Sequence, residues 1–297
     1  MELQIKKVEL TDKEWMDSFL QMKQDKGCDM CFANIYLWSR KYQTGYEMLE
    51  NCLIFADLSD LTSVSFPLGK KDDVKRAVIA LEQIFRDMGK PFALHLATQS
   101  DFELLESWFP GKYKIEYERD LADYVYESDK LINLSGKKYH SKKNHVNKFK
   151  EQYSDWSYEK ITDENVEACF QMALKWRRMN GCEEDDEKLA EMCVTLNALR
   201  LMHELDLTGG LIRANGEVVA FSIGEELNRN MYVVHIEKAY SDVPGAYPMI
   251  NQQFVLHEAK DYPYINREDD SGVEGLRRAK ESYRPAFMLE KGMVTHV

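Results

Sequence analysis

The sequence predicts an α/β (α+β) protein built from two tandem domains, each with a mixed, mostly antiparallel sheet flanked by helices. Three observations support this. The chain has 297 residues, which is long for one domain and comfortable for two. Helical and strand-like apolar patterns alternate along both halves. Asn215-Gly216 lies between two apolar runs, which is a strong signal for a β-hairpin.

The first domain is expected over residues 1–130. A capping-box pattern from Thr11 to Glu14 predicts a helix that ends near Gln24. The apolar spacing from Tyr46 to Leu58 predicts two strands that turn at Glu50 and Asn51. The remaining elements expected here are a strand at 62–66, an amphipathic helix at 72–88 with Ile79 on its apolar side, a strand at 92–97, a helix opened by Ser100 and Glu103, and strands at 113–117 and 122–126.

Residues 131–154 are expected to form a basic linking helix. The stretch 136–150 contains six lysines, two histidines and no acid. Tyr139, Val146, Phe149 and Tyr153 recur at helical spacing, so one side of this helix can pack while the lysines face outward. The lysines then form either a solvated face or a phosphate-binding site near the helix N-terminus. For the second alternative the candidates are Lys137, Lys138, Lys142 and Lys143.

The second domain is expected over residues 155–297. Two helices are expected at 163–178 and 186–205, and the acidic run 183–187 before the second suits the dipole of that helix. The Asn215-Gly216 hairpin and a turn at 228–230 give a three-strand meander that ends near Ile236. A helix at 247–259, a strand at Tyr264, a helix at 273–283 and a strand at 286–294 follow. This is the order of an N-acetyltransferase-like (GNAT) domain, and the first half is compatible with the same type of sheet.

Charge and composition exclude several classes of function. The chain has 39 basic and 51 acidic residues, a net charge of −12, which argues against non-specific coating of DNA or anionic membrane. No apolar segment is long enough to span a bilayer and the first residues carry no export signal. Six cysteines without such a signal indicate reduced thiols, and no zinc spacing accompanies Cys28 and Cys31. We expect a cytoplasmic protein without a metal, and the oligomeric state is not predicted.

An unusual cluster of ionisable residues lies between Tyr264 and Pro285. Glu268, Asp269 and Asp270 follow a short strand, and Ser271 is expected to cap the next helix. The charges either complement the helix dipole or form a ligand site at a strand-to-helix corner. For the second alternative Glu268 is a candidate catalytic residue. The candidate substrate-binding residues are Lys238, Asn266, Arg267, Asp269, Asp270, Arg277 and Lys280.

A second group of candidates lies at the end of the strand before the 239–246 loop. Alternation along a strand places His235 and Glu237 on the same face. Glu237 is either a general base, if burial raises its pKa, or an ion-pair partner. His235 is either catalytic or a buried core histidine, and Tyr283 is either a proton donor or a packing residue. We also expect a charge-assisted bond between Arg267 and Glu237 or one of the nearby acids.

Three runs of residues carry a family resemblance. They are NREDD at 266–270 with GxEGLRxAKxSYxP at 272–285, GKKYHSKKNHVNKF at 136–149, and VVHIEKA at 233–239. Together they resemble the DUF2156 family, also called the phosphatidylglycerol lysyltransferase C-terminal-like family, most clearly over residues 130–297. The resemblance implies two tandem GNAT-like domains and transfer of an aminoacyl group from an ester on tRNA. We expect no counterpart here to the membrane portion of the lysyltransferases, so the resemblance fixes neither a lipid acceptor nor a tRNA donor.

The donor remains open at this stage. In GNAT folds the loop after the fourth strand cradles a pyrophosphate, and Gly245 and Ala246 suit that role, whereas Asp242 and Pro244 disfavour it. The candidate donors are therefore acetyl-CoA or another acyl-CoA, and aminoacyl-tRNA. The leading hypothesis is an acyl- or aminoacyl-transferase that acts on an amine or hydroxyl acceptor. The alternative is a non-catalytic module that binds a phosphorylated ligand or RNA through residues 136–150.

Overall fold

The computed structural model describes residues 3–25 and 27–297 and divides them into two compact units. Unit 1 comprises the described residues up to Asp123, together with Asp269–Gly272 and Leu289–Val297. Unit 2 comprises Tyr124–Glu268 and Val273–Met288. This division differs from the contiguous domains expected at 1–130 and 155–297, and residues 131–154 belong to unit 2. Local strand patterns do not tell which sheet a strand joins, so the interleaving of the chain was not visible in the sequence.

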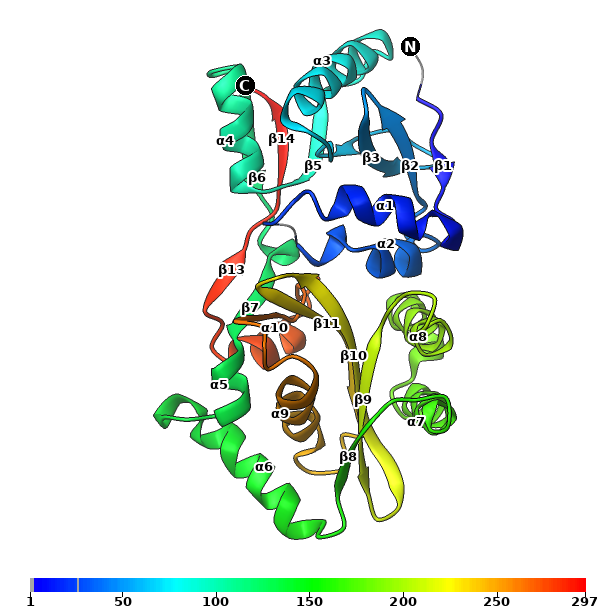
Figure 1. Cartoon of the computed structure of the whole chain (residues 1–297), viewed down its shortest axis with the longest axis vertical. Coiled ribbons are helices and arrows are strands. Elements are labelled where there is room, and N and C mark those ends of the chain that lie inside the picture. Colours follow the sequence, from blue (N-terminus) through cyan, green and yellow to red (C-terminus); the bar gives the residue numbers. More distant parts are fainter. Residues whose placement is uncertain (1–2, 26) are drawn as a thin grey trace. The chain divides into compact units, whose positions relative to one another are not determined.

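The sheet of unit 1 has seven strands in the order β1-β2-β3-β4-β5-β14-β6 (Figure 1). They are β1 (Lys6–Lys7), β2 (Thr44–Leu49), β3 (Cys52–Asp57), β4 (Val64–Ser65), β5 (Ala93–Ala97), β6 (Tyr113–Tyr117) and β14 (Gly292–His296). β4 and β5 are parallel, and the other described pairs are antiparallel. Glu50 and Asn51 both have positive φ in the turn between β2 and β3, which confirms the predicted hairpin.

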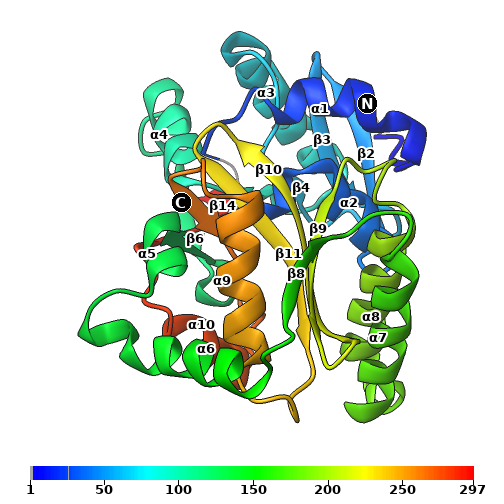
Figure 2. The same cartoon turned by 60° about the horizontal axis from the view of Figure 1, so that its bottom comes forward.

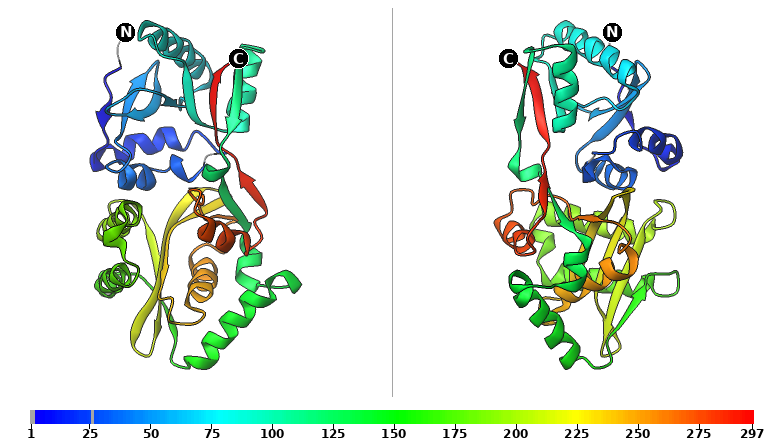
Figure 3. Two further views of the ribbon diagram at one scale, coloured as in Figure 1. Left: turned by 180° about the vertical axis from the view of Figure 1, so that it is seen from behind. Right: turned by 60° about the vertical axis from the view of Figure 1, so that its left-hand side comes forward.

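Four helices pack on the sheet of unit 1, with α1 and α2 on one face and α3 and α4 on the other (Figure 3). They are α1 (Lys13–Leu20), α2 (Phe32–Trp38), α3 (Lys71–Asp87) and α4 (Gln99–Trp108). The core under α3 includes Val74, Leu81 and Phe85. The prediction for Ile79 was wrong, because this side chain is 49% exposed. Leu10–Asp12, Cys28–Met30 and Arg119–Leu121 are short 3-10 turns.

The sheet of unit 2 has the order β13-β7-β12-β11-β10-β9-β8. Its strands are β7 (Asp123–Glu127), β8 (Ser157–Lys160), β9 (Thr208–Ala214), β10 (Glu217–Asn228), β11 (Met231–Ala239), β12 (Tyr264–Asn266) and β13 (Phe287–Leu289). β11 and β12 are parallel, and the pairs β7–β12, β10–β11, β9–β10 and β8–β9 are antiparallel. Both sheets are therefore mixed and mostly antiparallel, which confirms the predicted GNAT-like fold class.

The helices of unit 2 cover both faces of its sheet, with α7 and α8 on one side and α9 on the other (Figures 1 and 2). α5 and α6 pack against α9. The helices are α5 (Ser128–Asn133), α6 (His140–Gln152), α7 (Val166–Met179), α8 (Asp186–Arg200), α9 (Ala246–Glu258) and α10 (Glu274–Glu281), with 3-10 turns at Lys137–Tyr139 and Cys182–Glu184. The Asp185 carboxylate accepts from the N–H groups of Glu187 and Lys188, so the acidic run does serve the N-terminus of α8.

Several predicted helix starts and one strand were wrong in detail. The capping boxes use Glu9 with Asp12 and Thr98 with Asp101, two residues earlier than predicted in each case. Ser271 does not cap α10, since its φ is +46° and the helix begins at Glu274 after Val273. The predicted strand at 286–294 is two strands in different sheets, β13 and β14. α2 and α5 were not predicted, because both are short and need tertiary packing.

Candidate functional site

The pairing of β11 and β12 sets the position of the candidate site. The last paired residues are Val233 of β11 and Asn266 of β12. β11 continues to Ala239 while the chain after Asn266 turns away, so Glu237 and Arg267 lie just past the end of the parallel pair. His235 and Glu237 are both partly buried, whereas Ile236 and Lys238 between and beside them are buried, as strand alternation requires.

The Glu237 carboxylate is held on both oxygens. Arg267 Nη2 donates to its Oε1 at 2.9 Å, and Asn251 Nδ2 donates to its Oε2 at 3.0 Å. The Arg267 and Glu237 side chains are 11% and 13% exposed, so this is a largely desolvated pair. The structure confirms the predicted charge-assisted bond of Arg267 and selects Glu237 as its partner.

Aromatic rings surround the guanidinium of Arg267. Its carbon lies 4.7 Å from the ring centroid of Tyr283 and 5.6 Å from that of Tyr126. Burial disfavours the charge of Arg267, but the adjacent Glu237 carboxylate outweighs this, and the pKa of Arg267 is raised. Burial raises the pKa of Tyr283 although Arg267 opposes it, so this hydroxyl keeps its proton at neutral pH. Tyr283 therefore packs in the site and also retains a proton to donate.

Two buried polar atoms in this site lack a hydrogen-bond partner among the described residues. They are Arg267 Nη1, a donor, and Asn251 Oδ1, an acceptor. Buried polar atoms are almost always paired, so such atoms call for a water molecule or a ligand. Asn251 was not predicted. The available signal was an amide within the apolar run of α9, where Met249, Ile250 and Phe254 are buried.

Lys142 enters the site from α6. Its Nζ lies 4.1 Å from the ring centroid of Tyr283, the ring that also contacts Arg267. Burial lowers the pKa of Lys142 and the charge of Arg267 lowers it further, while Glu237 partly opposes both. The sequence placed Lys142 with the outward-facing lysines. The structure instead brings it to the Glu237–Arg267 pair.

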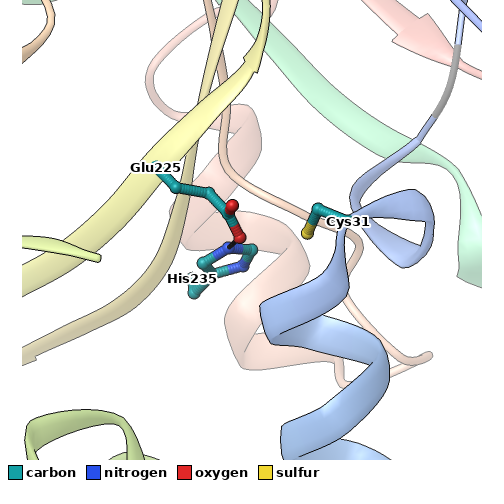
Figure 4. A group of neighbouring side chains, drawn as sticks. All are labelled: Cys31, Glu225 and His235. Atoms are coloured by element: carbon teal, nitrogen blue, oxygen red, sulfur yellow. Dashed lines mark hydrogen bonds and ion pairs between the residues drawn. The ribbon is translucent and has the colours of Figure 1, made fainter. Parts of the chain in front are cut away.

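His235 is bracketed by two carboxylates. Its Nε2 lies 2.9 Å from Glu225 Oε1 and its Nδ1 lies 2.8 Å from Glu268 Oε1. Figure 4 shows the Glu225 side chain reaching from β10 to the imidazole ring on β11. A neutral imidazole carries one N–H, so only the imidazolium donates to both carboxylates. His235 is therefore a largely buried side chain whose two ring nitrogens both have carboxylate partners, on the same face of β11 as Glu237.

This arrangement predicts the protonation of His235. At pH 7 we expect both ring nitrogens to carry a proton, because each faces a carboxylate oxygen at hydrogen-bond distance. The measurement is ¹⁵N NMR of histidine-labelled protein, in which the two ring nitrogens of an imidazolium have similar shifts. Glu268→Gln should weaken this signature, since it removes one carboxylate, while Glu226→Gln on the same strand as Glu225 should not. A neutral-tautomer pattern in the wild type would contradict the assignment.

Three other candidates hold the structure around the site. Lys238 lies on the opposite face of β11, with its Nζ 2.5 Å from Glu191 and 4.0 Å from the ring centroid of Trp176. Asn266 is fully buried and its Oδ1 accepts from the N–H of Glu268 at 2.7 Å. Lys280 Nζ donates to the carbonyl of Arg267 at 2.6 Å. Asn266 and Lys280 therefore fix the backbone that presents Arg267 and Glu268.

The three consecutive acids are divided between the units. Glu268 belongs to unit 2, while Asp269 and Asp270 belong to unit 1. The buried Asp270 carboxylate accepts from Arg119 Nη1 at 3.3 Å and from the N–H of Gly272 at 3.0 Å. Asp269 accepts from the N–H of Ser271 at 2.9 Å. Arg277, also a substrate-binding candidate, is partly exposed on α10.

The predicted phosphate-binding groups are dispersed. Lys137, Lys138 and Lys143 are exposed on or beside α6. Gly245, at φ +86°, packs so closely against α6 that an added Cβ would lie 2.6 Å from the carbonyl oxygen of His145. The N–H of the buried Ala246 donates to Val243 O at 3.1 Å. An acceptor oxygen and an occupied donor at the first turn of α9 both disfavour a pyrophosphate there.

Comparison with known proteins identifies the family. A family model described as "Phosphatidylglycerol lysyltransferase, C-terminal" matches residues 21–294. The chain belongs to this family. No helix within residues 3–25 or 27–297 has the length and apolar character needed to cross a membrane.

Three similar proteins extend the comparison. A conserved protein of unknown function from Bacteroides thetaiotaomicron is 32% identical, with a TM-score of 0.90 over 99% of this chain and 100% of the other. The C-terminal domain of a putative lysylphosphatidylglycerol synthetase from Agrobacterium fabrum is 11% identical, with a TM-score of 0.67 over 97% and 92%. An uncharacterised Mycoplasmoides gallisepticum protein is 25% identical over 68% of this chain, and the match spans only 65% of that relative.

Proposed function

We propose that this protein is an acyl- or aminoacyl-transferase whose reaction centre is the Glu237 cluster of unit 2. The observation that carries the proposal is a desolvated carboxylate beside two unpaired buried polar atoms, Arg267 Nη1 and Asn251 Oδ1. Membership of the lysyltransferase C-terminal family supports the reaction class. The crowded first turn of α9 favours an aminoacyl ester over a coenzyme A thioester as donor.

The residues of the cluster suit the three tasks of acyl transfer. Glu237 accepts the proton of the attacking amine or hydroxyl. Arg267 Nη1 stabilises the negative charge that develops on the carbonyl oxygen of the donor. Tyr283 stays protonated and can donate its proton to the leaving oxygen. We include a cytoplasmic location in the proposal, supported by six cysteines that are all free thiols.

The test is transfer from a labelled donor by the full chain. Lysyl-tRNA with phosphatidylglycerol vesicles and acetyl-CoA with a mixture of amines cover the two donor classes. Glu237→Gln keeps the shape of the side chain but cannot take up the proton, so we expect turnover to fall about a hundredfold. Glu191→Gln is the matched control, since Glu191 pairs with Lys238 on the opposite face of β11, and it should retain activity. Transfer from neither donor, or equal turnover by both variants, would refute the proposal.

A further inference from the structure

Two cations share one aromatic ring in the candidate site. Lys142 Nζ lies 4.1 Å and the Arg267 guanidinium 4.7 Å from the centroid of Tyr283. The two positive charges repel each other, and the charge of Arg267 lowers the pKa of Lys142. Among the described residues no carboxylate lies within ion-pair distance of Lys142, and the Glu237 carboxylate is already engaged by Arg267 and Asn251. Lys142, Arg267 and Glu237 together therefore carry a net charge of about +1.

The N–H donors of these two cations are not all used in hydrogen bonds. Arg267 directs Nη2 to Glu237, while Nη1 is buried without a partner among the described residues. An ion pair that satisfied the whole guanidinium would leave no such atom. The neighbouring ammonium of Lys142 adds three further donors. Burial and the charge of Arg267 both lower the pKa of Lys142, so both disfavour its charged form. A bound anion would stabilise that charged form.

We propose that Lys142 and Arg267 form a subsite for one monoanionic oxygen group of a substrate, a carboxylate or a phosphodiester. One such charge brings the cluster of Lys142, Arg267 and Glu237 to neutrality. The inference rests on the proposed function only in that both use the same cluster. The subsite explains why one lysine of α6 turns inward while Lys143, the next residue, is exposed.

The experiment uses the full chain labelled with ¹⁵N-arginine and titrated without any donor. Dimethyl phosphate represents the phosphodiester and N-acetylglycine represents the carboxylate, and sodium chloride at matched ionic strength is the blank. We expect one of the two probes to produce a saturable shift of a guanidinium signal that chloride does not produce. The probe that binds more tightly identifies the source of the anion.

Variants of neighbouring lysines test the role of Lys142. Lys142→Gln should weaken binding of the preferred probe about tenfold, the loss expected for one charge-assisted bond, and Lys142→Arg should restore most of it. Lys143→Gln removes the same charge from the exposed side and should change affinity less than about twofold. Thermal melting verifies that each variant is folded. Equal losses in the two glutamine variants, or no saturable shift with either probe, would overturn the inference.

The experiments distinguish failure of the anion subsite from failure of the proposed function. Binding of a probe by a protein that transfers no acyl group would refute the proposed function alone. Transfer that depends on Glu237, together with no anion binding in the wild type, would refute the subsite alone.

Discussion

Arg267→Ala is expected to destabilise unit 2 by about 3–5 kcal/mol, because it leaves the Glu237 carboxylate desolvated without its cation. Glu237 is 13% exposed and would keep only the hydrogen bond from Asn251. The variant also loses the contacts of the guanidinium with the rings of Tyr283 and Tyr126. The measurement is urea unfolding followed by circular dichroism. Hydrogen exchange read by mass spectrometry assigns the loss to peptides of unit 2.

Two further variants show whether the loss arises from the unpaired charge. The double variant Arg267→Ala with Glu237→Gln should recover part of the stability, since no buried carboxylate then remains unpaired. Arg278→Ala is the matched control, because its pair with Glu274 is 74% and 75% exposed and should leave the melting temperature nearly unchanged. Equal destabilisation by the two single arginine variants would show that burial of the Arg267–Glu237 pair is not the cause.

Lys291→Met is expected to destabilise unit 1 by a similar amount, about 3–5 kcal/mol. Lys291 is 2% exposed and its Nζ lies 2.7 Å from the fully buried carboxylate of Asp123. Asp29 also pairs with this ammonium, and Cys28 Sγ lies 3.8 Å from it. A metal ion could in principle be held by the side chains of Cys28, Asp29 and Asp269. The ammonium group of Lys291 already provides a positive charge at this place. Methionine fills the volume of the lysine stem, so the loss would report the missing charge.

The pH dependence of this loss has a definite sign. The pKa of Lys291 is raised well above its ordinary value, since the charges of Asp123 and Asp29 outweigh the effect of burial. A raised lysine pKa contributes stability that is fully present below the unfolded-state value of about 10.4 and is lost as pH rises through the folded-state value. The difference between wild type and Lys291→Met should therefore stay constant from neutral pH to about pH 10.

Two further variants test whether the destabilisation by Lys291→Met arises from the unpaired buried charge. Adding Asp123→Asn to Lys291→Met should restore part of the stability, because the buried charge is removed together with its partner. Lys114→Met breaks an exposed lysine pair in the neighbouring strand β6 and should leave unfolding unchanged. If Lys291→Met unfolded at the same urea concentration as the wild type, the buried network would not stabilise unit 1.

The sequence by itself determined most of the local structure. Turns that require positive φ, such as Glu50-Asn51 and Asn215-Gly216, and long amphipathic segments such as α3 are encoded within a few residues. Strand alternation likewise placed His235 and Glu237 on one face of β11. The sequence also predicted a charge-assisted bond of Arg267 to Glu237 or one of the acids that follow it, and the structure selected Glu237. The turns, the amphipathic helix and the strand alternation depend on neighbours in the chain and need no knowledge of the fold.

Only the tertiary structure decided which distant residues meet. Asn251 of α9 bonds Glu237, Tyr126 of β7 contacts Arg267, and Lys142 of α6 contacts Tyr283, and nothing in their local sequence specifies these long-range contacts. The same holds for the assignment of β14 to the sheet of unit 1 and of β7 to the sheet of unit 2, since a strand pattern specifies a buried face but not a neighbour. The division of Glu268 from Asp269 between the two units follows from these pairings. Burial then made the Arg267–Glu237 pair a desolvated site with unpaired polar atoms, a property that belongs to the packed side chains and not to the order of residues.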